Sequence, residues 1–288
     1  MLKSPTFISI LALVLIWAIY SQSNDEEISP VQSTHPISAS SQKSVKAVTK
    51  TLTETSEKTE EFQGLEIPKP LTDRNEIVLR HLGYTVSYNK GLGNPNWVAW
   101  HLTADKVNGT AERKGIKFQE DPDISEPRVS TKDYVHSGYD RGHMCPAGDN
   151  KWSREAMVQS FYMTNVCPQN HNLNRGDWNE MEQQCRKWAT KYGDVYIVAG
   201  PIFYKKQNER IGDYGVAVPN AFFKVVLCMK GTPKAIGFLY KNGEGNRPKG
   251  DYVNSVDQVE RITGIDFFPS LPDAIENKVE AECNYADW

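Results

Sequence analysis

The chain has 288 residues, of which 39% are hydrophobic and 24% are charged, a composition typical of a soluble globular protein with one large domain or two small ones. Its formal net charge of −3 at pH 7 excludes a protein that attracts polyanions through a strongly basic overall field. The first 66 residues carry 5 basic and 8 acidic side chains, which leaves 28 of each in the remainder, so polyanion binding there requires a local patch or a metal ion.

The N-terminal segment begins with one basic residue, Lys3, and continues as an apolar run from Phe7 to Tyr20. These 14 residues are typical of a signal-peptide core, whereas a full membrane span needs about 20. Ser21 and Ser23 supply the small residues of a cleavage site. We therefore expect residues 1–23 to be a signal peptide or an uncleaved signal-like anchor, and the protein to be extracytoplasmic, either secreted or periplasmic.

The next segment, residues 24–66, is rich in Ser, Thr, Lys and Glu and has few large apolar side chains, so it cannot bury enough surface to offset the entropy of ordering. We expect a disordered tether there and a folded domain over residues 67–288. Five cysteines in an exported chain leave at least one without a partner inside the chain, and the sequence does not give their pairing.

Strands and helices alternate irregularly along this domain. Residues 76–103 predict a strand, a Gly/Asn/Pro turn and a second strand. Further strands are expected at 194–203, 221–230 and 233–242, the last two joined by a turn at Gly231–Pro233. Neighbouring strands with short connections indicate an α+β fold with a mostly antiparallel sheet and helices packed on it.

Three helices are expected. Ser153 is a suitable N-cap for a helix over residues 153–165, and a last helix is expected over 255–265. The strongest prediction is a helix over 175–193, where four apolar residues recur at spacings of 3, 4 and 3 and Gly193 ends the pattern. Those four residues, which we expect to pack in the core rather than against a base, are Trp178, Met181, Cys185 and Trp188.

Three polar clusters stand out within this framework. They are "DRGHMCP" at 140–146, "TNVCPQNHNLNRGDW" at 164–178 and "NEMEQQ" at 179–184. Each has an ordinary structural interpretation, because Asn-rich segments form turns and a Glu pair on a helix commonly faces solvent. Their joint order and spacing is the informative feature.

In that order, together with "VAWHLT" before and "VYIVAGPIF" after, the clusters resemble the DNA/RNA non-specific endonuclease family, which includes the Serratia-type nuclease and endonuclease G. The resemblance implies the ββα-metal (His-Me finger) nuclease core on a mostly antiparallel sheet. It also implies DNA and RNA as substrates, Mg²⁺ (or Mn²⁺ in its place) as cofactor, and a homodimer as one compatible assembly.

The family roles transfer to particular residues of this chain. His143 matches the general base and Asn174 the direct metal ligand, while Glu182 matches the helix residue that holds a metal-bound water. Arg141 matches an arginine near the scissile phosphate, Arg113 an upstream arginine that contacts the phosphate, and Asn165 an asparagine that supports the site. The resemblance groups these three residues as substrate-binding. The resemblance thus predicts His143, Arg141 and Glu182 as catalytic.

These residue types suit phosphodiester hydrolysis. A histidine with an ordinary pKa near 6.5 can accept a proton from water at neutral pH, and arginine binds phosphate oxygens with two donors at once. Mg²⁺ retains most of its waters and therefore needs few protein ligands. Asn174 and Glu182 are eight residues apart, about two helical turns, so they can approach one pocket.

Three alternatives remain open at this stage. His143, Cys145, Cys167 and His171 could form a zinc site, since structural zinc prefers such Cys/His sets. The chain could instead be a non-catalytic module that binds nucleic acid or zinc. It could also be a related phosphodiesterase with another substrate, because the domain has no overall basic charge.

Overall fold

The computed structural model describes residues 64–288 except 205, 206 and 244. The predicted signal or anchor and nearly all of the predicted tether lie outside the described residues. Leu65 is fully buried in one of the two large cores, so the folded part of the chain includes this residue.

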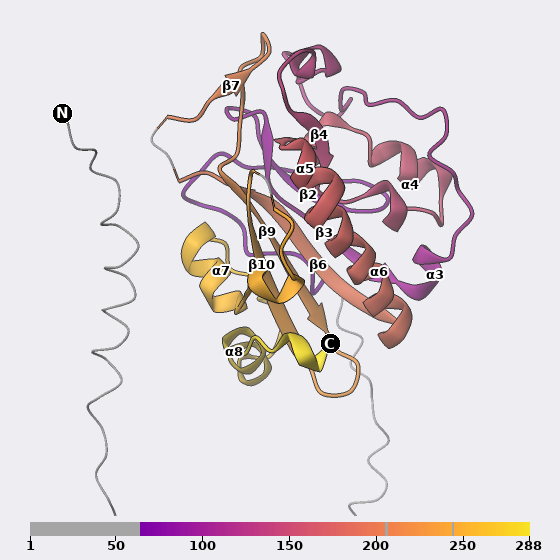
Figure 1. The fold of residues 1–288 in the computed structure, drawn as a ribbon, viewed down its shortest axis with the longest axis vertical. Helices are drawn as coiled ribbons and strands as arrows, with labels where there is room; N and C mark the ends of the chain where they lie inside the picture. Colours follow the sequence, from indigo (N-terminus) through magenta and orange to yellow (C-terminus); the bar gives the residue numbers. More distant parts are fainter. Residues whose placement is uncertain (1–63, 205–206, 244) are drawn as a thin grey trace, which may run out of the picture. The chain divides into compact units, whose positions relative to one another are not determined.

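The centre of the domain is a seven-stranded sheet in the order β1-β2-β3-β6-β9-β10-β11, with antiparallel neighbours throughout (Figure 1). The strands are β1 (Ile77–Arg80), β2 (Thr85–Asn89), β3 (Asn94–Thr103), β6 (Asp194–Ile202), β9 (Ala221–Cys228), β10 (Lys234–Lys241) and β11 (Val253–Asn254). Two separate strand pairs are β4 (Asp140–His143) with β5 (Val166–Gln169), and β7 (Arg210–Ile211) with β8 (Val216–Ala217). The predicted α+β class with a mostly antiparallel sheet is confirmed.

Helices cover both faces of the sheet. The long helix α6 (Asn179–Tyr192) lies on one face and α7 (Val256–Thr263) and α8 (Asp273–Ala281) lie on the other (Figure 1). The shorter helices are α3 (Ala104–Val107), α4 (Arg154–Gln159) and α5 (His171–Leu173). Because both sheet faces are covered, the central strands β3, β6 and β9 are buried at nearly every position.

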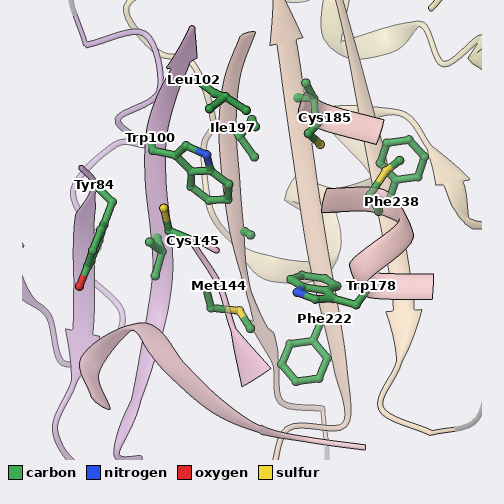
Figure 2. Packing of buried hydrophobic residues seen from close by; sticks show 14 of the residues in the cluster. Tyr84, Trp100, Leu102, Met144, Cys145, Trp178, Cys185, Ile197, Phe222 and Phe238 are labelled. Atoms are coloured by element: carbon green, nitrogen blue, oxygen red, sulfur yellow. The ribbon is translucent and has the colours of Figure 1, made fainter. Parts of the chain in front are cut away.

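The alternation within β9 shows how one strand supplies both cores. Phe222 and Val226 belong to the core under α6, whereas Phe223 and Val225 belong to the core under α7 and α8. Figure 2 shows the first of these cores, where Trp178 lies beside Phe222 and the side chain of Cys185 also points into the cluster. The four periodic residues of α6 are all buried, which confirms their expected place in the core.

Three local predictions needed correction. Residues 76–103 hold three strands rather than two, because β1 and β2 pair with each other before the turn. Helix α4 starts after its predicted N-cap Ser153 but ends at Gln159, and the following Phe161 and Met163 are buried in different clusters. Tertiary burial of these two side chains therefore ends the helix early. Helix α8 was not predicted.

Candidate active site

One large cavity of about 890 Å³ opens beside β4 and the start of α6. Five of the six predicted site residues line it: Arg113, Arg141, His143, Asn174 and Glu182. They come from a loop before β4, from β4 itself, from the turn before α6 and from α6. The fold thus gathers residues that are up to 69 positions apart in sequence.

The pairing of β4 with β5 fixes the direction of His143. Gly142 lies opposite Cys167, and a Cβ at Gly142 would come within 2.6 Å of the Cβ of Gln169, so only glycine fits between the strands. The indole Nε1 of Trp178 donates to the carbonyl oxygen of His143 at 3.1 Å. This bond ties β4 to the segment that leads into α6.

The imidazole of His143 packs against two aromatic rings that also contact each other. The ring centroids of Phe118 and Phe161 both lie 4.9 Å from it, and its Nε2 is buried without a hydrogen-bond partner among the described residues. Burial, with a smaller contribution from the nearby charge of Arg113, lowers the pKa of His143 to about 3. The side chain is therefore neutral at neutral pH, and in this buried state it is a weaker base than an ordinary histidine.

Asn174 lies on a π-helical turn, Asn174–Trp178, that precedes α6. Its amide Nδ2 donates to Asp140 Oδ2 at 2.9 Å, which leaves the amide oxygen as the atom free to bind a cation. Although burial opposes its ionisation, hydrogen bonds from Asn174 and His171 lower the pKa of Asp140, so its carboxylate stays charged and holds the amide. An oriented amide oxygen beside a hydrated cavity fits Mg²⁺, which keeps most of its waters.

Glu182 lies in the first turn of α6. Burial raises its pKa to about 7, and the charges of Lys224, Arg186 and Arg113 act against that rise while Asp149 adds to it. At neutral pH the carboxyl group of Glu182 is therefore partly protonated and partly ionised, and the neighbouring cations favour its ionised form. A hydrated divalent ion nearby would favour the charged form.

Comparison with known proteins identifies the family. A family model described as DNA/RNA non-specific endonuclease matches residues 61–274, which is more than half of the chain. The chain belongs to this family.

Relatives with this nuclease domain occur in animals and in cyanobacteria. "Nuclease EXOG, mitochondrial" of Xenopus laevis is 38% identical over 208 residues, which cover 67% of this chain and 58% of that protein. Its human counterpart is 35% identical over 209 residues, covering 66% and 56%. A protein named "Nuclease" from Nostoc sp. is 33% identical over 235 residues, covering 74% of this chain and 82% of its own. The chain therefore spans less than two thirds of the EXOG proteins.

A solved structure of endonuclease G in complex with its inhibitor EndoGI has the same fold. It superimposes with a TM-score of 0.67 at 29% sequence identity and covers 76% of this chain and 95% of that one. The predicted family and the ββα-metal nuclease core are thus confirmed for this chain.

The expected extracytoplasmic location is contradicted by these relatives, since those from Xenopus laevis, human and Saccharomyces cerevisiae are named as mitochondrial nucleases. The prediction failed because a short apolar N-terminal run reports only a preference for an apolar environment, and this preference does not specify a compartment. In the part of the chain that the structure describes, no helix is both long and apolar enough to cross a bilayer.

Asn165, the sixth predicted site residue, does not line the cavity. It is 0% exposed, and its side chain is used entirely for backbone contacts. Its Oδ1 accepts from Cys145 N at 2.9 Å, and its Nδ2 donates to the carbonyls of Cys145 at 2.8 Å and Ser160 at 2.7 Å. These contacts fit the site-supporting role that the resemblance implies rather than a direct contact with substrate, because Asn165 fixes the chain that leaves β4.

The zinc alternative is not supported either. Cys145 and Cys167 are buried, whereas His171 is exposed and bonded to Asp140. Among the described residues, the one group of His, Cys, Asp or Glu whose ligand atoms lie close enough together to hold a metal does not include any of these side chains. All five cysteines are free in this structure.

Two charged residues near the site escaped the sequence analysis. Arg186 donates to the buried Asp149 at 2.8 Å and lines the cavity; it lies four residues after Glu182 and therefore on the same side of α6. Lys224 is 0% exposed, and its Nζ has no hydrogen-bond partner among the described residues. A lysine inside the apolar run "AFFKVVLC" was the signal that could have identified it.

Lys224 occupies a position of β9 on the same side of the strand as Phe222 and Val226, which pack in the core under α6. Its Nζ lies 4.3 Å from the ring centre of Trp178 and 5.3 Å from that of Trp100. The two indole faces stabilise the ammonium in place of water. This buried cation contributes to keeping the pKa of Glu182 from rising further.

The cavity itself is basic although the domain is not. Its lining includes six basic side chains, Arg113, Lys114, Arg141, Lys151, Arg175 and Arg186, against three acidic ones, Glu112, Asp140 and Glu182. A local excess of this kind attracts phosphates without an overall positive charge. It supplies the local patch that the neutral composition required.

Proposed function

We propose that this protein is a metal-dependent endonuclease that hydrolyses phosphodiester bonds in DNA and RNA without sequence specificity. The observation that supports it best is a neutral, buried His143 in the same basic cavity as the oriented amide of Asn174 and the carboxylate of Glu182. Membership of the DNA/RNA non-specific endonuclease family agrees with this reading.

In this proposal His143 accepts a proton from the attacking water. Its low pKa keeps it unprotonated before the reaction, and the two neighbouring aromatic rings that pack against it restrict its orientation. The proton transferred to the imidazole is then released to solvent through the open cavity.

Arg141 and Arg113 are proposed to bind phosphate oxygens. Arg141 is held at one end by the carbonyl oxygen of Thr131 at 2.9 Å, while its buried Nε has no partner among the described residues. Arg113 lies over the ring of Phe161 at 5.4 Å. Both guanidinium groups are thus positioned by the protein before substrate arrives, which lowers the entropic cost of binding.

Asn174 would bind Mg²⁺ through its amide oxygen, with Asp140 fixing the amide, and Glu182 would accept a hydrogen bond from a water on the ion. When bound, the cation polarises the phosphoryl group and stabilises the negative charge of the departing oxygen. Mn²⁺, which takes the same oxygen ligands, is expected to substitute.

The test is digestion of plasmid DNA and of RNA by the purified protein, with and without EDTA. His143→Ala should lower the rate by a factor of about 10² to 10⁴, the usual contribution of a general base. His101→Ala is the matched control, because His101 pairs with Asp194 at 2.7 Å and does not line the cavity. Full activity in EDTA, or in His143→Ala, would contradict the proposal.

A further inference from the structure

Three carboxylates lie together on the sheet face opposite the catalytic cavity. Asp257 and Glu260 come from α7 and Glu280 comes from α8, the two helices packed on that face (Figure 1). One oxygen from each of the three lies within 4.8 Å of the other two, and no other such group occurs among the described His, Cys, Asp and Glu residues.

Glu280 is the decisive member of this group. It is only 6% exposed, and its Oε1 is buried with no hydrogen-bond partner among the described residues. An ionised carboxylate in this position has lost its water without gaining a donor, which is a costly arrangement unless a cation completes it.

The surroundings of the group add negative charge and supply little to balance it. Asp266 and Glu276 add further negative charge near this group. Lys69 forms an exposed salt bridge with Asp266 at 3.1 Å. Glu260 is already fixed, because its Oε1 accepts from the backbone N of Phe267 at 2.7 Å. Within the described residues, none of the three carboxylates makes a salt bridge.

Such a group reaches electrical balance either by holding protons or by binding a cation. Burial and the neighbouring carboxylates raise the pKa of Glu280 to about 9 and that of Glu260 to about 7, which shows how strongly the group disfavours three free negative charges. Carboxylate oxygens are the preferred ligands of hard divalent ions, and Ca²⁺ tolerates an irregular set of such ligands better than Mg²⁺ does.

We propose that Asp257, Glu260 and Glu280 form a Ca²⁺ site that joins α8 to α7 and is separate from the catalytic centre. The family match ends at residue 274, within the first turn of α8, so Glu280 lies beyond the segment that this chain shares with the family model. The inference does not depend on the proposed nuclease activity.

The experiment measures Ca²⁺ binding to the full chain by equilibrium dialysis, alongside the melting temperature in EDTA and in Ca²⁺. Asn174→Ala serves as the background, because it removes the expected ligand of the catalytic metal. We expect this background to bind one Ca²⁺ per chain and to melt at a higher temperature with Ca²⁺ than with EDTA.

Adding Glu280→Gln should weaken Ca²⁺ binding at least tenfold and abolish the thermal shift. Glu282→Gln is the matched control, since it makes the same change of charge two residues away on an exposed side chain. Glu280→Gln should fold at least as well as its parent in EDTA, because glutamine has nearly the shape of the protonated, uncharged carboxyl group that Glu280 adopts without a cation. Should it fail to fold, Asp257→Asn provides the second variant, with the same tenfold loss expected.

Two results would overturn the site. One is absence of bound Ca²⁺ in the Asn174→Ala background at neutral pH, which would mean that the group is balanced by protons alone. The other is equal Ca²⁺ binding by the Glu280→Gln and Glu282→Gln chains. Nuclease activity in Mg²⁺ should be unchanged by Glu280→Gln, so failure of this site and failure of the proposed function are distinguishable.

Discussion

Replacing Asn165 with alanine tests whether this residue supports the site or binds substrate. Three hydrogen bonds would be lost, two to Cys145 and one to Ser160, and the backbone groups that made them would stay buried. At about 1 kcal/mol for each bond the loss of unfolding free energy is about 3 kcal/mol, and unpaired backbone groups can increase it. For a domain of this size that corresponds to a fall in melting temperature of about 6–12 °C.

The assay pairs thermal unfolding with kinetics measured well below the melting temperature. We expect Asn165→Ala to have a lower melting temperature. Its KM for nucleic acid should change little, because the side chain of Asn165 does not reach the cavity. Asn277→Ala is the control, since Asn277 is exposed and makes one backbone bond, to Asp273 O at 2.6 Å, so its melting temperature should barely change. An unchanged melting temperature for Asn165→Ala combined with a raised KM would refute the structural assignment.

Three further predictions concern the cavity. Lys224→Met should raise the pKa of Glu182, because it removes the positive charge that lowers this pKa most. Activity at pH 7 should fall about two- to tenfold, and the acid limb of the pH–rate profile should move to higher pH. An acid limb at the same pH as in the unmodified protein would contradict an effect of Lys224 on Glu182. His143 stays neutral in the folded protein down to a pKa of about 3, whereas a histidine in the unfolded chain binds a proton below about pH 6.5. Protonation therefore favours the unfolded chain, and His143 should lower the free energy of unfolding as the pH falls from about 6.5 towards 3. In urea unfolding, the decrease in this free energy from pH 7 to pH 5 should be smaller for His143→Gln than for the unmodified protein. Asp140→Ala should release the amide of Asn174 and raise the Mg²⁺ concentration for half-maximal activity about tenfold or more; an unchanged Mg²⁺ titration would show that the amide needs no such support.

Local sequence patterns determined much of the fold. The apolar spacing of Trp178, Met181, Cys185 and Trp188 specifies one buried face of α6, because a helix brings residues three and four apart onto one side. Gly193, with φ of 96°, ends that helix where the pattern ends. The order of the three polar clusters was also sufficient to indicate the family and four of the predicted residues that line the cavity.

Only the tertiary structure decided what each polar group meets. Asn165 and Asn174 both lie in the same Asn-rich segment. Asn165 is buried and hydrogen-bonded to Cys145, whereas Asn174 lines the cavity. The difference arises because burial depends on the strands and helices that cover a residue. Lys224 comes close enough to influence the pKa of Glu182 only because β9 packs beneath α6. The neutral state of His143 likewise comes from rings contributed by Phe118 and Phe161, which local patterns around the histidine do not reveal.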